Sequence, residues 1–424
     1  MEESLLKDIP AGCNERVEAI KEKLLAVLAD HKIKTTDIQA VSVPSVTTYN
    51  VYPAKGVSCA KIKRLQDEIE LSLDAGGVRV VTLPDSVGIE VANEHPSIVP
   101  LKPLLGSDEF KNSDAALPVA AGCDTEGRPC VIDLAEAPHI LMAGATKQGK
   151  TMAVHSLILS LLRSRTPDEV KFVFIDPKGY ELKAYKSLSS NYILTASNAA
   201  NEKVITTPAG AETLLRELCE EMESRREALV SAGAADIREL HDSGKAMPHI
   251  VVIIDEFADL TAPTWIDRKI DKLPDEIMGH IVRLAQNGGA AGIHLVITTQ
   301  SVSPRVITGI IKASFPTRMA FRVFSKAESK IILDVPGAER LIGSGDMLLE
   351  CGDKITWVQG AYSGREEIYD IIGSDPLFDE ACRIVQERQL VSASMLQLKL
   401  GIGYHRAAKL KEALDEAGIV KSEE

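Results

Sequence analysis

The 424-residue sequence lacks three features: a long hydrophobic run, an excess of positive charge, and clustered cysteines. Because no stretch reaches about eighteen consecutive apolar residues, the sequence predicts no transmembrane helix. It begins MEESLLKDIP, which is acidic and has neither the basic start nor the apolar middle of a secretory signal. These absences predict a soluble, cytoplasmic chain.

The seven cysteines, at positions 13, 59, 123, 130, 219, 351 and 382, include no CxxC pair. Scattered thiols of this kind are typical of reduced, buried side chains and not of a metal site. The formal net charge of −13 argues against a protein coated with positive charge for nucleic acid. Residues 392–411 differ, because they hold four basic residues and no acidic one: Lys399, Arg406, Lys409 and Lys411. A basic module of this kind can still bind DNA within an acidic protein.

The chain is organised around residues 137–151, APHILMAGATKQGKT. The apolar run at 139–142 predicts a strand, and 152–165 carries apolar residues at helical spacing. A strand, a glycine-flanked loop and a helix form the context of a P-loop. Gly144 and Gly149 allow backbone N–H groups to approach phosphate oxygens, and the helix N-terminus adds the positive end of its dipole.

This loop therefore predicts a nucleoside triphosphate site, the alternative being a turn that only resembles a P-loop. We expect Lys150 to reach the β- and γ-phosphates and the Thr151 hydroxyl to ligate Mg²⁺. The predicted nucleotide-binding residues are Gly144, Ala145, Thr146, Lys147, Gln148, Gly149, Lys150, Thr151 and Met152.

Two acidic residues, Asp255 and Glu256, follow the apolar run at 250–254. This run has no polar face, so we expect a strand in the middle of a sheet. Two acids at its end would be costly to bury without a cation. With a P-loop in the same chain, Asp255 is expected to hold Mg²⁺ through its water shell and Glu256 to act as general base. The alternative is a helix N-cap.

Two further strands end in polar residues. The strand predicted at 294–298 runs into Thr299 and Gln300, a pair that could sense the γ-phosphate or serve in a turn. The strand at 171–176, KFVFID, ends in Asp-Pro-Lys-Gly, a turn at the carboxyl edge of the sheet, where ligands collect.

Three domains are expected: a small α+β domain over 1–105, an α/β domain over 106–372, and a helical piece over 373–424. Alternating strand and helix patterns in the second domain imply a largely parallel sheet. Residues 100–118 resemble a linker, since they are punctuated by proline, glycine and serine.

In the last piece, helices at 392–400 and 404–417 flank a glycine turn, which is the helix-turn-helix signature. The side chains expected to meet bases and phosphates are Tyr404, His405, Arg406 and Lys409. A three-helix cap for protein contacts is the alternative.

Together these segments resemble the FtsK/SpoIIIE family of bacterial DNA translocases. The resemblance rests on FIDPKGYEL, IVVIIDEFADL, AAGIHLVITTQ, VITGIIKASFPTRMAFRV, ERLIGSGDMLLE and the C-terminal IGYHRAAKLKEALDEAGIV. It implies an N-terminal α domain, a RecA-like β motor and a winged-helix γ domain. It also implies ATP and Mg²⁺ as cofactors and a hexameric ring around double-stranded DNA. The process would be chromosome segregation, cell division or a related DNA transfer, with recombinase or divisome proteins as partners.

By this resemblance, Lys150, Thr151, Asp255, Glu256 and Gln300 occupy the Walker A, Walker B and sensor positions. The loop reads GATKQGKT where the family usually has GTTGSGKS. For the arginine that acts on a neighbouring subunit's nucleotide, we expect Arg225 first and Arg318 second, although Ser224 and Lys330 stand where the family usually has arginines. In the loop at 301–312, Arg305 and Lys312 are expected to contact DNA.

The family's usual membrane-spanning N-terminal region is absent, so we expect either a trimmed motor portion or a stand-alone soluble member. Two rival functions remain: a related secretion or conjugation ATPase that moves protein or single-stranded DNA, and a DNA-binding regulator that uses ATP as a switch. The basic C-terminal helices argue against the first. The intact Asp255–Glu256 pair argues against the second, because a pure switch needs no general base.

Overall fold

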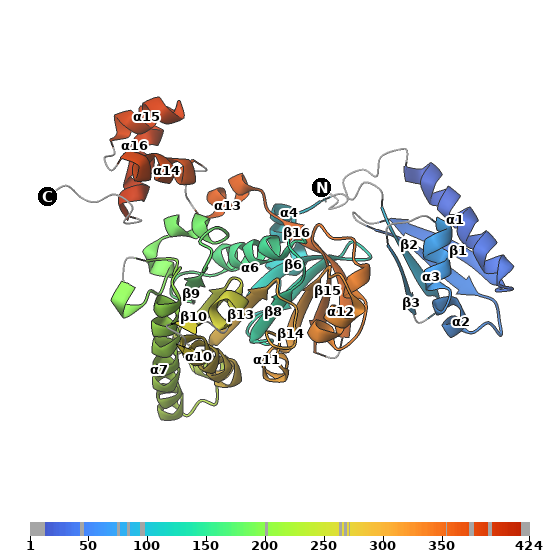
Figure 1. The fold of residues 1–424 in the computed structure, drawn as a ribbon, viewed down its shortest axis with the longest axis horizontal. Helices are drawn as coiled ribbons and strands as arrows, with labels where there is room; N and C mark the ends of the chain where they lie inside the picture. Colours follow the sequence, from blue (N-terminus) through green and yellow to red (C-terminus); the bar gives the residue numbers. More distant parts are fainter. Residues whose placement is uncertain are drawn as a thin grey trace.

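Three parts of the chain follow one another in space, as Figure 1 shows: an N-terminal α+β domain, a central α/β domain and a C-terminal group of helices. This is a computed structural model, which describes residues 13–42, 46–73, 77–82, 85–93, 98–199, 202–262, 265–266, 269–270, 272–352, 354–372, 377–388 and 392–416.

The N-terminal domain is an antiparallel sheet with helices packed on it. Its strands are β1 (Thr35–Ser42), β2 (Val46–Pro53), β3 (Val78–Thr82) and β4 (Val87–Ala92), in the order β1-β2-β4-β3. Its helices are α1 (Cys13–Asp30), α2 (Cys59–Lys63) and α3 (Gln66–Leu73). Leu24, Tyr49 and Ile89 are fully buried between them, so this domain has an apolar core of its own.

The central domain is built on one long sheet, in the order β7-β6-β16-β15-β14-β8-β13-β10-β9, with β5 beside β16. Its strands are β5 (Val99–Pro100), β6 (Pro118–Asp124), β7 (Pro129–Asp133), β8 (His139–Ala143), β9 (Val170–Ile175), β10 (His249–Ile254), β13 (Ile293–Thr299), β14 (Thr317–Phe321), β15 (Asp346–Cys351) and β16 (Lys354–Tyr362). The neighbouring strands β14, β8, β13, β10 and β9 are paired in parallel. The pairs β14–β15, β15–β16, β16–β6 and β6–β7 are antiparallel. The largely parallel sheet expected from the sequence is therefore confined to one half. In the other half short turns join β15 to β16 and β6 to β7, and an antiparallel pair needs no crossover helix.

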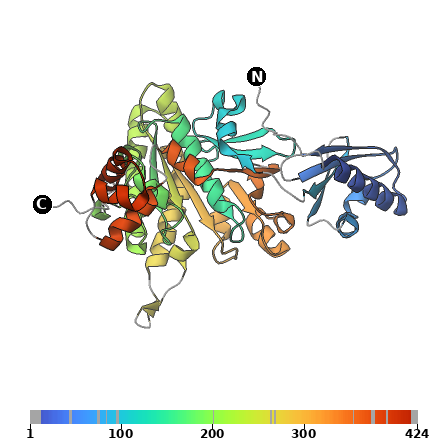
Figure 2. The ribbon, with the colours of Figure 1, turned by 90° about the horizontal axis from the view of Figure 1, so that it is seen from above.

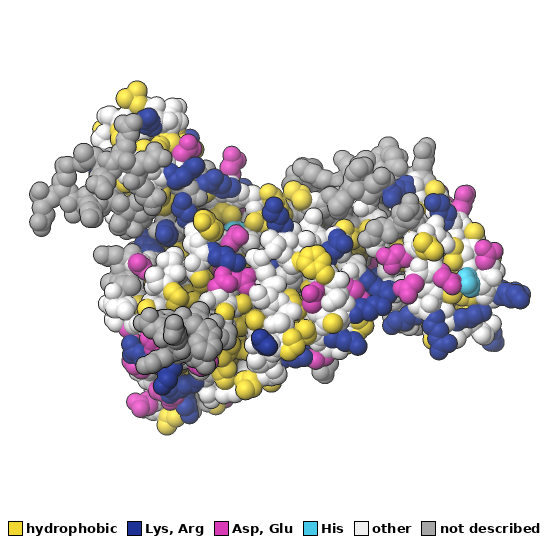
Figure 3. Space-filling model, viewed as in Figure 1, with side chains coloured by type: hydrophobic (Ala, Val, Ile, Leu, Met, Phe, Trp, Pro, Cys, Tyr) yellow, Lys and Arg dark blue, Asp and Glu magenta, His cyan; other side chains and the backbone are white. Residues whose placement is uncertain are grey.

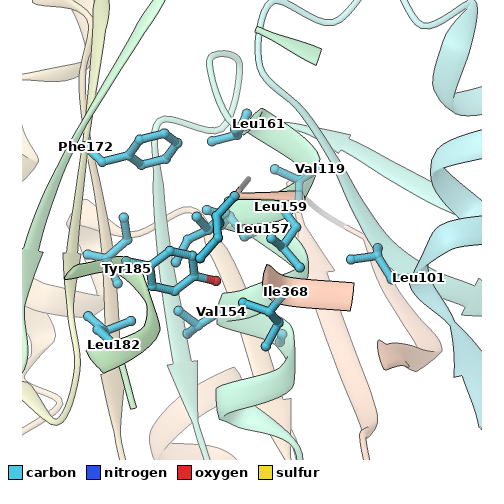
Figure 4. Close-up of a cluster of buried hydrophobic side chains, with 14 of the residues drawn as sticks. Leu101, Val119, Val154, Leu157, Leu159, Leu161, Phe172, Leu182, Tyr185 and Ile368 are labelled. Atoms are coloured by element: carbon cyan, nitrogen blue, oxygen red, sulfur yellow. The ribbon is translucent and has the colours of Figure 1, made fainter. Parts of the chain in front are cut away.

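Helices cover both faces of this sheet. On one face lie α4 (Leu101–Gly106), α6 (Lys150–Ser164) and α13 (Arg365–Ile371); Figure 4 shows Val154 and Leu157 of α6 in the same apolar cluster as Tyr185 and Ile368. On the other face lie α7 (Pro208–Ala232), α10 (Leu273–Asn287), α11 (Gly309–Ser314) and α12 (Lys326–Leu333). Because both faces are covered, β8, β10 and β13 are buried along their whole length and mostly apolar, and polar groups collect at the strand ends.

The prediction of a linker over 100–118 is wrong for most of its length. The segment forms α4 and α5 (Asp108–Lys111), and Leu101, Leu104 and Phe110 are buried in the central core. Proline at position 100 directly precedes α4, where a missing N–H costs no helical hydrogen bond. The punctuation thus marks the beginning of a helix.

The remaining elements connect the core or lie outside it. They are η1 (Lys183–Ser187), η2 (Ser190–Tyr192), η3 (Ser197–Ala199), α8 (Ile237–Asp242), α9 (Phe257–Thr261), η4 (Gly289–Ala291) and η5 (Ala338–Arg340). A hairpin of β11 (Trp265–Ile266) and β12 (Lys269–Ile270) projects from the body, as Figure 2 shows. Across the part of the chain that the structure describes, no helix combines the length and apolar character needed to cross a bilayer.

The C-terminal group contains α14 (Phe378–Arg388), α15 (Ala393–Leu400) and α16 (Tyr404–Glu416). Leu396, Leu410 and Leu414 form its buried core, and Gly401, with φ of +63°, ends α15 in the left-handed conformation that glycine favours. The predicted helix, glycine turn and helix are present. A wing would have to involve residues after 416, which lie outside the described residues.

A polar contact joins the N-terminal domain to the central one. Arg340 donates a hydrogen bond to Asp67 of α3 over 2.9 Å. Glu90 of β4 is buried 3.8 Å from the Arg79 guanidinium, and burial raises the pKa of Glu90 to about 7. On the central side, burial likewise raises the pKa of Asp346 to about 7. Carboxyl groups are thus removed from water near this junction.

Candidate nucleotide site

The strand order brings the two principal motifs together at one edge of the sheet. Strand β13 pairs with β8 on one side and with β10 on the other, all three running parallel. The P-loop follows β8, the acid pair follows β10, and Gln300 follows β13. Because parallel strands end at the same edge, segments far apart in the sequence meet there.

The P-loop backbone depends on two glycines. Gly144 has φ of +152°, and a Cβ there would lie 2.8 Å from the Phe321 Cβ. Gly149 has φ of +116°, and a Cβ there would lie 2.5 Å from the Gly345 Cα. Hydrogen bonds to other segments hold the loop, among them those from Ala145 N to Arg322 O and from Gly345 N to Gln148 O, both of 2.9 Å. Glycine is therefore required by conformation and by space.

Lys150 begins α6 and turns its side chain back into the loop. Its Nζ donates to Gly144 O over 2.6 Å and to Ala145 O over 2.7 Å. Burial lowers its pKa to about 8, although Glu256 and Asp255 act in the opposite direction. The ammonium group thus lies at the mouth of the loop, and it can exchange these carbonyl contacts for phosphate oxygens.

Asp255 is fixed at the end of β10 by its neighbours on both sides. Its N–H donates to Ile175 O over 2.9 Å, and its Oδ1 accepts a 2.6 Å hydrogen bond from the Thr298 hydroxyl. Burial raises its pKa to about 6, against the lowering effect of the Thr298 hydrogen bond. A carboxylate removed from water in this way favours a nearby cation.

Glu256 is almost completely buried and has φ of +45°, a conformation rare outside glycine. Its Oε1 accepts from the Thr299 hydroxyl over 2.9 Å, and both carboxylate oxygens lie within 3.1 Å of Gln300 N. Strain of this kind persists only where the surroundings over-determine the backbone, and such residues cluster at functional sites. The carboxylate is therefore held firmly at the strand tips.

Gln300 lies at the tip of β13 and contacts the P-loop. The Thr146 hydroxyl donates to its Oε1 over 2.6 Å. Thr146 and Lys147 are exposed, whereas Thr151 and Met152 are half-buried on the first turn of α6. The structure thus brings together all the predicted nucleotide residues of the P-loop with Asp255, Glu256 and Gln300.

These residues fit a magnesium ion bound with a nucleotide. The Thr151 hydroxyl and the half-buried Asp255 carboxylate are hard oxygen donors, which Mg²⁺ prefers. Within the described residues, no group of three or more His, Cys, Asp or Glu side chains could hold a metal alone. Mg²⁺ is commonly held by one or two protein groups and completed by water and phosphate oxygens, so the small donor set is what this site requires.

Sequence reasoning missed two contributors to the site. Lys178, in the turn after β9, places Nζ 3.6 Å from the Glu256 carboxylate. The segment 343–345 lies against Gln148 and Gly149. Both belong to conspicuous motifs, FIDPKGYEL and ERLIGSGDMLLE, and the position of Lys178 after a strand was a usable signal.

The predictions for the interface arginine are not supported. Arg225 is buried, and its guanidinium donates to Pro248 O over 2.8 Å, to Ala291 O over 3.1 Å and to Glu221 over 2.8 Å. It lies by the start of β10, at the edge of the sheet opposite the P-loop. Arg318 is held by Glu350, Asp334 and three backbone carbonyls. Both guanidiniums are thus engaged by groups of their own chain.

The predicted DNA contacts lie in two places. Tyr404, His405, Arg406 and Lys409 are all exposed at the beginning of α16, and Arg305 is exposed after β13. Lys312 is less exposed, and its ammonium is paired with Asp334 at 2.5 Å. On the face in Figure 3, basic and acidic side chains are interspersed over the central domain, so no single basic surface covers it.

Comparison with known proteins matches all three parts of the chain. The model described as FtsK/SpoIIIE family matches residues 100–304, the FtsK alpha domain matches 4–93, and the FtsK gamma domain matches 373–424. A protein named DNA translocase FtsK from Chlorobaculum tepidum is 36% identical over 98% of this chain, which covers 56% of that protein. DNA translocase SftA of Bacillus subtilis is 36% identical over 95% of this chain, which covers 44% of it. The chain thus spans about half the length of these relatives.

Two solved structures share the fold. The monomer of the pCW3 conjugation coupling protein TcpA with ATPγS has a TM-score of 0.58 and 24% identity, covering 85% of this chain and 98% of that chain. The cytoplasmic domain of the type VII secretion ATPase EccC from Thermomonospora curvata has a TM-score of 0.52 and 24% identity, covering 65% and 34%. The fold is therefore that of P-loop ATPases.

Proposed function

Because the chain belongs to the FtsK/SpoIIIE family, we propose that it hydrolyses ATP and uses the hydrolysis to move along double-stranded DNA. The observation that carries this proposal is the position of β13 between β8 and β10, which sets Lys150 beside Asp255 and Glu256. The Lys150 ammonium, which would bind phosphate, and the Glu256 carboxylate, which would bind the attacking water, then lie on the same side of the sheet edge. That combination suits cleavage of a phosphoanhydride bond by water.

Each residue has a distinct part in this reaction. Lys150 binds the β- and γ-phosphates, which replace the carbonyls of Gly144 and Ala145 as its partners. Thr151 and Asp255 would hold Mg²⁺, which neutralises charge on the phosphates when bound. Glu256 accepts the proton of the attacking water, and Gln300 detects the γ-phosphate from the tip of β13.

Nucleotide state can reach the N-terminal domain through one continuous segment. Gly345 N donates to Gln148 O in the P-loop, and Arg340, five residues earlier, holds Asp67 of α3. Asp346, the residue after Gly345, holds this segment in a turn, because its Oδ2 accepts a hydrogen bond from Ile342 N over 2.7 Å. A change in the P-loop therefore shifts the anchor of the N-terminal domain, and this relative motion would move DNA.

We further propose that the chain works as a homo-oligomer, a ring of six around the duplex, with phosphate contacts that depend on salt and little on sequence. The cation that acts across the subunit interface must be an exposed side chain, since Arg225 and Arg318 are engaged within the chain. Helix α16, with Arg406 and Lys409, would contact DNA directly.

The test is ATP turnover with and without duplex DNA. We expect duplex to raise turnover several-fold, single-stranded DNA of the same length to raise it little, and Lys150→Ala to abolish turnover. Equal stimulation by single-stranded DNA would favour a coupling ATPase of the conjugation type. No stimulation by either DNA would contradict the proposal.

A further inference from the structure

The turn after β9 is built to hold one lysine in a fixed place. Asp176, fully buried at the end of β9, accepts hydrogen bonds from the N–H groups of Lys178 at 3.1 Å, Gly179 at 2.8 Å and Leu182 at 3.1 Å. Asp176 N donates to Ile205 O over 2.8 Å, which fixes the turn to the segment before α7. Side-chain caps of this kind define a turn sharply. The turn therefore fixes the backbone of Lys178, from which its partly exposed side chain extends.

That side chain reaches the candidate general base. Lys178 Nζ lies 3.6 Å from Glu256 Oε2 and 3.6 Å from Asp259 Oδ2. The Glu256 side chain is 4% exposed, whereas those of Lys178 and Asp259 are 40% and 46% exposed. Among the ion pairs of the described residues, this is the one that includes Glu256. The ammonium thus approaches the buried carboxylate from the solvent side.

The two oxygens of Glu256 are held unequally. Oε1 accepts from both the Thr299 hydroxyl and Gln300 N, whereas Oε2 shares the Gln300 N–H and faces Lys178. Oε2 is therefore the oxygen with capacity to accept a further proton donor. An attacking water would have to meet the carboxylate on this side, where the ammonium also lies.

We propose that Lys178 is a positioning residue for hydrolysis, which holds the Glu256 carboxylate in its water-facing orientation. This inference rests on the proposed role of Glu256 as general base. Without the ammonium, a buried carboxylate beside a negatively charged γ-phosphate loses a compensating charge and rotates away from this position. Because the lysine stem is long and partly exposed, the ammonium can yield space to water without losing its attraction to Glu256.

The test compares Lys178→Met, which keeps the stem length without the charge, with Lys178→Arg, which keeps the charge. Lys178→Met should lower kcat by about 10- to 100-fold while KM for ATP stays within about twofold. Lys178→Arg should recover most of the loss. Lys171→Met is the matched control, because this lysine lies on β9, the strand that leads into the turn, and its Nζ donates a hydrogen bond to Asn191 O. Lys178→Gln serves if the Met variant does not fold.

Two outcomes overturn the inference. Turnover by Lys178→Met close to that of the wild type would mean that Glu256 needs no partner. A higher KM with unchanged kcat would mean that Lys178 binds nucleotide instead. Glu256→Gln, assayed in parallel, separates this inference from the proposed function. If Glu256→Gln retains turnover, the proposed function itself fails. If Glu256→Gln is inactive while Lys178→Met is active, only the role of Lys178 fails.

Discussion

The hydroxyl of Thr146 donates a 2.6 Å hydrogen bond to the side-chain oxygen of Gln300, which joins the P-loop to the tip of β13. The backbone N–H of the same Gln300 donates to Glu256. One residue therefore contacts both the phosphate-binding loop and the candidate base. A γ-phosphate that displaces Thr146 from Gln300 would therefore act on the residue whose N–H group is hydrogen-bonded to Glu256.

Gln300→Ala should separate chemistry from binding. We expect kcat to fall by about 10- to 100-fold, because the water-facing end of β13 loses its polar group. Binding of a fluorescent ATP analogue should change little, since Lys150 and the loop N–H groups remain. Gln286→Ala, an exposed glutamine on α10, is the control and should behave as wild type. Equal losses in both variants would contradict the sensor role.

Gly149→Ala should destroy nucleotide binding. The added Cβ would lie 2.5 Å from the Gly345 Cα at a φ of +116°, so the loop must shift at a cost of about 1 to 3 kcal/mol. Gly279→Ala is the matched control, because a Cβ there meets nothing within 4 Å and the residue is inside α10. It should stabilise the protein by about 0.5 to 1 kcal/mol. Thermal unfolding and isothermal titration with an ATP analogue measure both effects. Normal ATP binding by Gly149→Ala would refute the account of the loop.

Glu90 should make stability depend on pH. Its pKa is raised from 4.5 to about 7 by burial, so the folded protein binds this proton more tightly than the unfolded chain. The contribution is present below pH 4.5 and is lost as pH rises through about 7, by up to about 3 kcal/mol.

Glu90→Gln tests this directly. The variant should gain stability relative to wild type as pH rises from about 5 to about 8, measured as the midpoint of thermal unfolding. Glu22→Gln, an exposed glutamate on α1, should show a constant difference. A flat difference for Glu90→Gln would mean that Arg79 compensates the charge fully.

Lys409→Ala should weaken DNA binding and lower the slope of log K against log salt by about one, as loss of one phosphate contact does. Lys411→Ala on the same helix is the control, because its ammonium is paired with Asp415 at 2.7 Å. Fluorescence anisotropy with a labelled duplex at several salt concentrations gives both slopes. An unchanged slope for Lys409→Ala would place the DNA contact elsewhere.

The sequence predicted the parts of the site that are local. Gly144, Gly149 and Lys150 lie in one short loop, and their spacing in the sequence indicates phosphate binding. Asp255 and Glu256 follow an apolar strand that could only be buried. Parallel strands end at one edge, so even the meeting of these motifs followed from simple rules.

What could not be predicted depends on tertiary packing. Arg225 reads as a surface cation on a long helix, yet backbone carbonyls at the opposite edge of the sheet enclose it. The contact of Gly345 with Gln148 joins two segments that are distant in the sequence, and no pattern of residue spacing predicts it. Lys178 was visible at the carboxyl end of a strand, but its partner Glu256 becomes apparent only when β9 and β10 lie side by side.

Displacement of a third strand from duplex DNA tests the central claim most directly. With ATP and Mg²⁺, the wild-type protein should remove a triplex-forming oligonucleotide placed ahead of it on a duplex, and Glu256→Gln should bind ATP but leave the triplex intact. Displacement by Glu256→Gln, or none by a wild-type protein that hydrolyses ATP, would contradict the account.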